Sequence, residues 1–110
     1  MDSRQLYKAA EHLGKTLTWE KAWIHFGTAN EIKYDLIDDL IKNFLQSDQI
    51  KFVHERANSG TIKSLNVLPK IKDLLRRSNF ELWNDPMERA IQFNRIGVLL
   101  KGEKMQYNFT

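Results

Sequence analysis

The stretch that predicts the fold runs from Thr28 to Leu68 and reads TANEIKYDLIDDLIKNFLQSDQIKFVHERANSGTIKSLNVL. Its first four residues, from Thr28 to Glu31, have the form of a capping box at the N-terminus of a helix. Apolar residues then recur at helical spacing and form one broad face: Ile32, Leu36, Ile37, Leu40, Ile41, Phe44 and Leu45. Residues 50–56 and 61–68 alternate like strands around the small residues 57–60. The stretch therefore predicts a capped helix to about Gln46, followed by a β-hairpin.

Two shorter helices are predicted before this stretch. Ser3 can cap a helix that runs to about Leu13 and ends at Gly14. From Thr18, apolar residues fall at i, i+3, i+4 and i+7 before Gly27, which suits a left-handed cap: Trp19, Ala22, Trp23 and Phe26. Only Gly27 and the cap residue would separate this second helix from the long third one, so we expect a steep crossing.

The remainder of the chain predicts a helical extension. Pro69 suits the first turn of a fourth helix, and Asp85 with Pro86 suits the start of a fifth that continues to Lys101. This fifth helix would be apolar on two sides, so it is either sandwiched in the fold or shared between subunits. A homodimer through residues 86–101 is therefore one expectation. Alternation at Met105, Tyr107 and Phe109 predicts a short C-terminal edge strand.

Composition indicates one globular domain over residues 1–110 and gives no sign of catalysis. The apolar fraction of 42% and charged fraction of 28% are ordinary for such a domain. No apolar run is long enough to cross a membrane, no secretory signal begins the chain, and there are no cysteines, which fits the cytoplasm. His12, His25 and His54 lack metal-ligand spacing, and neither a phosphate loop nor a nucleophile motif is present. We expect a non-enzymatic protein without a metal or cofactor.

Charge is divided unevenly along the chain. The net charge is +3, but residues 1–50 carry six Lys/Arg against eight Asp/Glu, whereas residues 51–110 carry eleven against six. A basic C-terminal half is compatible with a polyanionic partner.

The order of elements resembles a winged helix-turn-helix domain over residues 3–68, with residues 69–110 as an extension. The fold class that this implies is α+β, with a core of three helices and a hairpin wing. The resemblance implies that residues 30–45 form the recognition helix. It places four polar residues in the wing: Lys51, Arg56, Asn58 and Lys63.

The outward face of this recognition helix is acidic. Glu31, Asp35 and Asp39 follow at i, i+4 and i+8, with Asp38 beside them, and such a face would be repelled by phosphate. Contact with duplex DNA is therefore expected at the first helical turn, from Asn30 onward, at the wing and on the basic fourth helix. The first hypothesis is a nucleic-acid-binding regulator, with these candidate residues: Lys33, Tyr34, Arg56, Lys63, Lys70, Lys72, Arg76 and Arg77.

The same acidic face supports an alternative. Like charges at i, i+4 spacing cost some helix stability, so their presence suggests a role in meeting a basic protein. The alternative is a small inhibitor or immunity protein that binds a nuclease or another nucleic-acid enzyme through Glu31, Asp35, Asp38 and Asp39.

Overall fold

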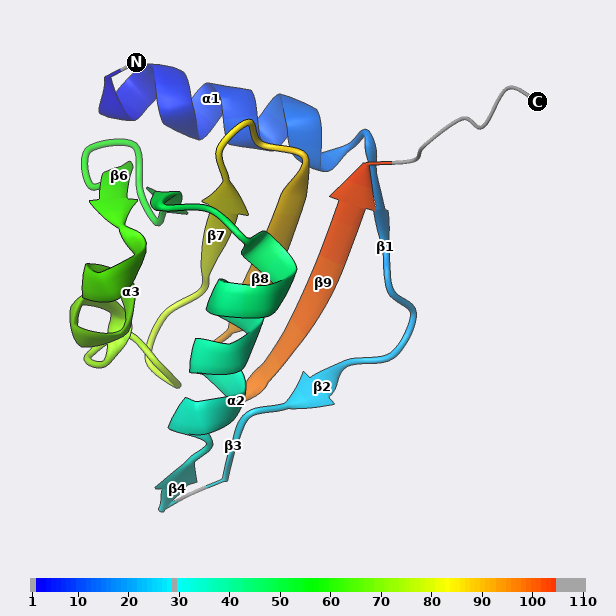
Figure 1. Cartoon of the computed structure of the whole chain (residues 1–110), viewed down its shortest axis with the longest axis vertical. Helices are drawn as coiled ribbons and strands as arrows, with labels where there is room; N and C mark the ends of the chain where they lie inside the picture. The colour runs from blue at the N-terminus through cyan, green and yellow to red at the C-terminus, as the bar shows by residue number, and fades with distance from the viewer. Residues whose placement is uncertain (1, 29, 105–110) are drawn as a thin grey trace.

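An antiparallel sheet of seven strands forms the centre of the computed structural model, which describes residues 2–28 and 30–104. The strand order is β1-β9-β8-β7-β5-β6, β2 also pairs with β9, and β3 pairs with β4 in a separate two-stranded sheet (Figure 1). In chain order the elements are α1 (Ser3–Gly14), β1 (Leu17–Trp19), β2 (Ile24–His25), β3 (Gly27–Thr28), β4 (Glu31–Ile32), α2 (Tyr34–Asp39), the π-helix η1 (Leu40–Leu45), β5 (Gln49–Val53), β6 (Gly60–Lys63), α3 (Ser64–Ile71), β7 (Phe80–Asn84), β8 (Arg89–Asn94) and β9 (Val98–Lys104).

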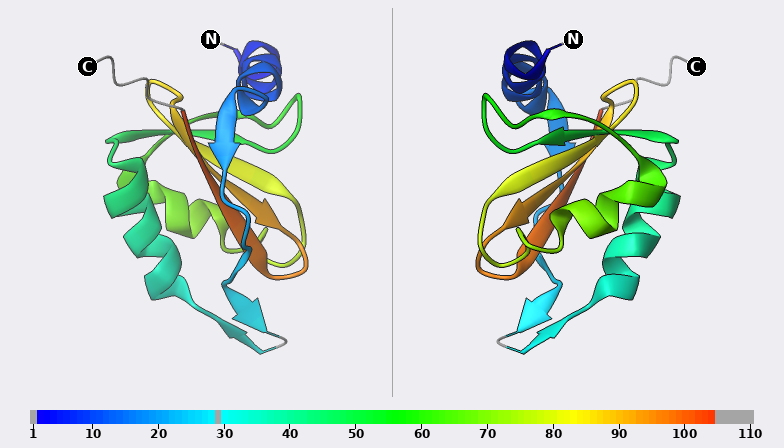
Figure 2. Two further views of the ribbon diagram at one scale, coloured as in Figure 1. Left: turned by 90° about the vertical axis from the view of Figure 1, so that its right-hand side faces the viewer. Right: turned by 90° about the vertical axis from the view of Figure 1, so that its left-hand side faces the viewer.

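Two apolar clusters cover the two faces of the sheet. The larger cluster lies between the sheet and the layer formed by α2, η1 and α3, which Figure 2 shows together on one side of the strands. The smaller cluster lies under α1 and includes Leu6, Ala10, Val53 and Trp83. The central strands are therefore buried on both faces, which is the condition for runs of consecutive apolar residues in a strand.

The first helix and the hairpin pairing are confirmed, but the prediction of a second strand over residues 61–68 was wrong from Ser64 onward, where α3 begins. Helix α1 buries Leu6 and Ala10 as its spacing predicts, although its cap is Asp2, which forms a reciprocal capping box with Gln5. Strands β5 and β6 pair antiparallel, with Ile50 opposite Ile62. However, β5 also pairs with β7 along its other edge, so this hairpin is part of the main sheet rather than a projecting wing.

The prediction of a helix from residue 30 was wrong at its start. Glu31 lies in strand β4, the helix begins only at Tyr34, and its N-cap is Lys33, which makes no side-chain cap hydrogen bond. The apolar stripe itself is confirmed from residue 37 onward, since the following residues are buried: Ile37, Leu40, Ile41 and Leu45. Gln46, with φ 51°, ends the helical segment as expected.

The predicted second helix does not form, because its residues pair with β9 instead. Trp19 lies opposite Gly102, and a Cβ on that glycine would be 2.6 Å from the indole Cε3. The indole therefore packs where the partner strand has no side chain. Helical spacing of aromatic residues could not reveal this pairing, because the partner lies some 80 positions along the chain.

The predicted fifth helix, from Pro86 to Lys101, was also wrong. Its residues form a turn and the strands β8 and β9, whose apolar residues are divided between the two faces of the sheet: Ala90 belongs to the cluster under α1, and Ile91 and Phe93 belong to the larger cluster. No two-sided helix is therefore present within the described residues to carry the expected dimer interface. The fourth helix begins five residues early, at Ser64, with Pro69 inside it. The C-terminal strand predicted at Met105, Tyr107 and Phe109 lies outside the described residues.

Together these differences overturn the winged-helix fold class. The molecule is mostly a seven-stranded antiparallel sheet with short helices, instead of a three-helix core with a two-stranded wing. Residues 80–104 supply the strands β7, β8 and β9 rather than a helical extension.

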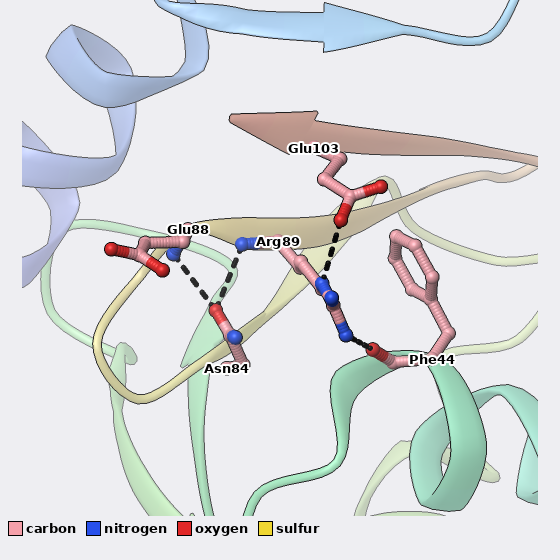
Figure 3. Close-up of polar contacts among 5 residues, drawn as sticks. All are labelled: Phe44, Asn84, Glu88, Arg89 and Glu103. Carbon is pink, nitrogen blue, oxygen red and sulfur yellow. Dashed lines mark hydrogen bonds and ion pairs between the residues drawn. The ribbon is translucent and has the colours of Figure 1, made fainter. Parts of the chain in front are cut away.

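A polar network fixes the turn between β7 and β8 (Figure 3). The Oδ1 atom of the buried Asn84 accepts the backbone N–H groups of Glu88 and Arg89, each at 2.8 Å. The Arg89 guanidinium donates to the Glu103 carboxylate at 3.0 Å and to the Phe44 carbonyl at 3.0 Å. Arg89 thereby supplies a hydrogen-bond donor to a carbonyl near the end of η1, where no following helical turn provides a backbone N–H.

Candidate nucleic-acid interface

Segments distant in sequence meet at the end of the molecule opposite the N-terminus (bottom of Figure 1). The Lys33 N–H donates to the carbonyl of Phe26 at 2.7 Å, and the Phe26 N–H donates to that of Gly97 at 2.9 Å. These two bonds join the start of α2, the strand β3 region and the turn between β8 and β9.

The loop that follows α3 joins the same end. The Lys72 Nζ lies 5.2 Å from the ring centre of Tyr34, a cation–π contact between the end of α3 and the start of α2. The Arg95 N–H donates to the Asn79 side chain at 2.8 Å, so the β8–β9 turn is held against the loop that contains Arg77. We call this surface the basic end: Lys33, Tyr34, Lys72, Arg76, Arg77 and Arg95.

Arg76 differs from the other cations of the basic end. Its backbone has φ 66°, and its side chain packs against two backbone segments that only glycine allows to come so close. A Cβ on Gly27 would be 3.0 Å from Arg76 Cδ, and one on Gly97 would be 3.5 Å from Arg76 Nε. The Nε atom is buried, so Arg76 ties the loop to the β8–β9 turn rather than presenting a free cation to solvent.

Exposed cations outnumber exposed acids around this end. Its exposed basic side chains are Lys33, Lys72, Arg77 and Arg95. Glu31 and Asp35, in β4 and the first turn of α2, are the nearest acids along the chain to Lys33. Asp73, next to Lys72, is exposed as well, so three exposed acids accompany the four exposed cations.

Three of the predicted phosphate-binding residues lie elsewhere. Arg56 is in the β5–β6 turn next to α1, where its carbonyl accepts the Ser3 hydroxyl. Lys63 ends the edge strand β6, opposite Gln49, and Lys70 lies on α3. The wing residues Lys51 and Asn58 bond within their own hairpin, to Thr61 and Glu55. The wing and the basic end are therefore separate surfaces.

The predicted acidic ridge is interrupted. Glu31 lies on β4, outside the helix, so the i, i+4, i+8 series does not run along one helix face. Asp38 pairs with Lys42 at 2.7 Å, and Asp39 accepts a hydrogen bond from Asn43. Asp35 is left as the exposed acid of the first turn of α2, with Glu31 preceding it. The structure therefore weakens the basis for the acidic-face hypothesis.

Two residues, Arg95 and Glu81, were not predicted, because their segments have the spacing of a helix or of a connector. Arg95 lies in the turn Asn94-Arg95-Ile96-Gly97, which is recognisable only once residues 86–101 are divided into two strands. Glu81 lies between the apolar residues Phe80 and Leu82, a pattern of alternation typical of a strand. Burial raises the pKa of the Glu81 carboxyl, and a hydrogen bond from Trp83 partly opposes that effect.

Residues 2–28 and 30–104 contain no cluster of three or more His, Asp or Glu side chains arranged to hold a metal ion. Within the same residues, no helix combines the length and apolar character needed to cross a membrane. No protein-family model matches the chain, and searches of the curated proteins and of the solved structures likewise find no match.

Proposed function

We propose that this chain is a non-enzymatic nucleic-acid-binding protein that contacts the phosphate backbone through the basic end. The observation that supports this most directly is the convergence of exposed cations from three separate segments: Lys33 at the start of α2, Lys72 and Arg77 after α3, and Arg95 in the β8–β9 turn. Clustered Lys and Arg side chains supply the sequence-independent part of nucleic-acid affinity by displacing counterions. A cytoplasmic location belongs to the proposal and rests on the absence of cysteine from the sequence.

The proposed contact differs from that of a recognition helix. Only the first turn of α2 reaches the basic end, and Asp35 in that turn disfavours insertion of the helix between phosphates. Loops and turns therefore make the contact, and the interaction is with the backbone rather than with base edges. Duplex DNA is the probe that suits this mode, because its phosphates are regularly spaced.

The test is the salt dependence of duplex binding. Four cations that each neutralise one phosphate give a slope of log Kobs against log[salt] of roughly −3.6, at about −0.9 per contact. Arg77→Gln combined with Arg95→Gln should reduce the magnitude of that slope by roughly 1.8. Fluorescence anisotropy of a labelled duplex, measured over a range of salt concentrations, gives both quantities.

A matched control removes two positive charges from the other surface. Arg56→Gln combined with Lys63→Gln lowers net charge equally but leaves the basic end intact. This control should retain the wild-type slope. Absence of duplex binding at low salt, or equal loss in the two double variants, would overturn the proposal.

A further inference from the structure

A cleft of ≈ 250 Å³ lies between α1 and the face of the sheet that α1 covers. Its apolar walls include Ala10 of α1 and Val53 of β5. The titratable side chains of the lining are Tyr7 and Glu11 from α1, His54 after β5, and Glu81 from β7. This volume is below that of drug-sized sites, so any ligand is small.

Glu81 is the central polar residue of this cleft. In the sheet it is paired with Val53 on one side and with Gln92 on the other, both of which also line the cleft. Its Oε1 atom accepts the indole N–H of Trp83 at 3.0 Å. Within residues 2–28 and 30–104, the structure gives Oε2 no hydrogen bond, and that oxygen retains acceptor capacity.

The charges around the cleft define the kind of ligand that complements it. The described lining contains two carboxyl groups, Glu11 and Glu81, but neither Lys nor Arg, and His54 is its only side chain able to carry positive charge. A desolvated carboxylate is stabilised by a cation placed within hydrogen-bond distance. The ring of Tyr7 and the side chain of Val53 add apolar surface for a short alkyl chain.

We propose that this cleft binds a small organic cation, an alkylammonium group, with the Glu81 carboxylate as its counter-ion. The site is independent of the proposed phosphate contacts, because it attracts the opposite charge and faces α1. Glu81 holds the cationic head through the oxygen that Trp83 does not engage, and the apolar walls receive the alkyl chain. Glu11, on the exposed side of α1, adds a weaker, solvent-screened attraction.

The Trp83 indole N–H provides a direct reporter, because it bonds to the proposed counter-ion. Its NMR signal is identified by elimination with Trp19→Phe and Trp23→Phe. The probe is n-butylammonium chloride, and 1-butanol is the neutral control of similar size. For so small a ligand a Kd of about 1–10 mM is expected, and titration to roughly 50 mM covers it.

Saturable movement of the Trp83 signal with butylammonium, absent with 1-butanol and with matched NaCl, is the expected result. Glu81→Gln keeps an acceptor for the indole but removes the charge, and should weaken binding at least tenfold. Glu11→Gln should weaken it by less than threefold. Equal binding by Glu81→Gln, equal response to 1-butanol, or no response in the wild-type protein would overturn the proposal, and the spectra themselves report whether each variant is folded.

Discussion

Replacement of Asn84 by alanine should be among the most damaging single polar substitutions in this chain. The side chain is buried, with an exposed fraction of 8%, and its Oδ1 atom accepts two backbone N–H groups across the β7–β8 turn. The turn also contains Met87 at φ 66°, a conformation that a non-glycine residue holds only when its surroundings impose it. Alanine leaves both donors without their acceptor while the turn stays strained.

The magnitude follows from those two hydrogen bonds. Each backbone donor that is left unsatisfied and shielded from water costs about 1–3 kcal/mol, and partial access of water favours the lower part of that range. Asn84→Ala should therefore reduce the free energy of unfolding by about 2–4 kcal/mol. For a domain of this size the corresponding fall in Tm is about 10–15 °C.

Urea and thermal unfolding, followed by circular dichroism, would measure the loss against a matched control. Asn79 also accepts a backbone N–H, that of Arg95, but it is exposed, so Asn79→Ala should cost no more than about 1 kcal/mol. Asn84→Asp keeps an oxygen for both donors and should recover part of the loss. An Asn84→Ala variant as stable as Asn79→Ala would refute the argument that the buried side chain holds the turn.

Two further predictions concern glycine geometry and pH. Gly97→Ala should destabilise by about 3 kcal/mol or more, because φ is +101° and the new Cβ would lie 2.6 Å from the Gly27 carbonyl oxygen. Gly60→Ala, where a Cβ meets nothing within 4 Å, should be close to neutral in the same denaturant titration; similar losses in both variants would contradict this reasoning. Burial raises the pKa of Glu81, so the folded state retains its proton to higher pH than the unfolded state, and stability should fall as pH rises between the two pKa values. Glu81→Gln should match the wild-type protein below that window and gain relative stability above it, and a pH-independent difference in unfolding free energy would show that the carboxyl is not responsible.

The elements that the sequence predicted correctly are those stabilised by local interactions. Helix α1 has its apolar stripe and its terminal glycine within 14 residues, although its cap is Asp2 rather than the predicted Ser3. The β5–β6 hairpin closes through a short turn of small residues. Charge asymmetry was visible as well, since it depends on composition alone. These features are present in the structure because they depend on interactions between residues that are close together in the chain.

The candidate site was predicted only in part. Five of the eight predicted phosphate-binding residues meet at the basic end, but one of them, Arg76, is turned inward, and Arg95 was missed. Arg56 and Lys63 are separated from it because the hairpin is incorporated into the sheet. Lys70 lies on α3, where it lines a hollow together with residues of that hairpin. Glu81 was overlooked because its burial depends on α1, which is far away in the sequence.

Local patterns were enough to predict α1, the apolar face of α2 and η1, and the β5–β6 pairing, and composition alone gave the lack of cysteine and the basic C-terminal half. That residues 86–101 form a turn and two strands depends on long-range pairing, because two apolar sides are equally consistent with a buried helix and with a strand covered on both faces. Trp19 becomes a strand residue because Gly102 offers it space, and the cations converge because β8 and β9 turn beside α2. Both outcomes depend on pairing between residues that are distant along the chain, and local sequence patterns cannot predict the free energy of such pairing.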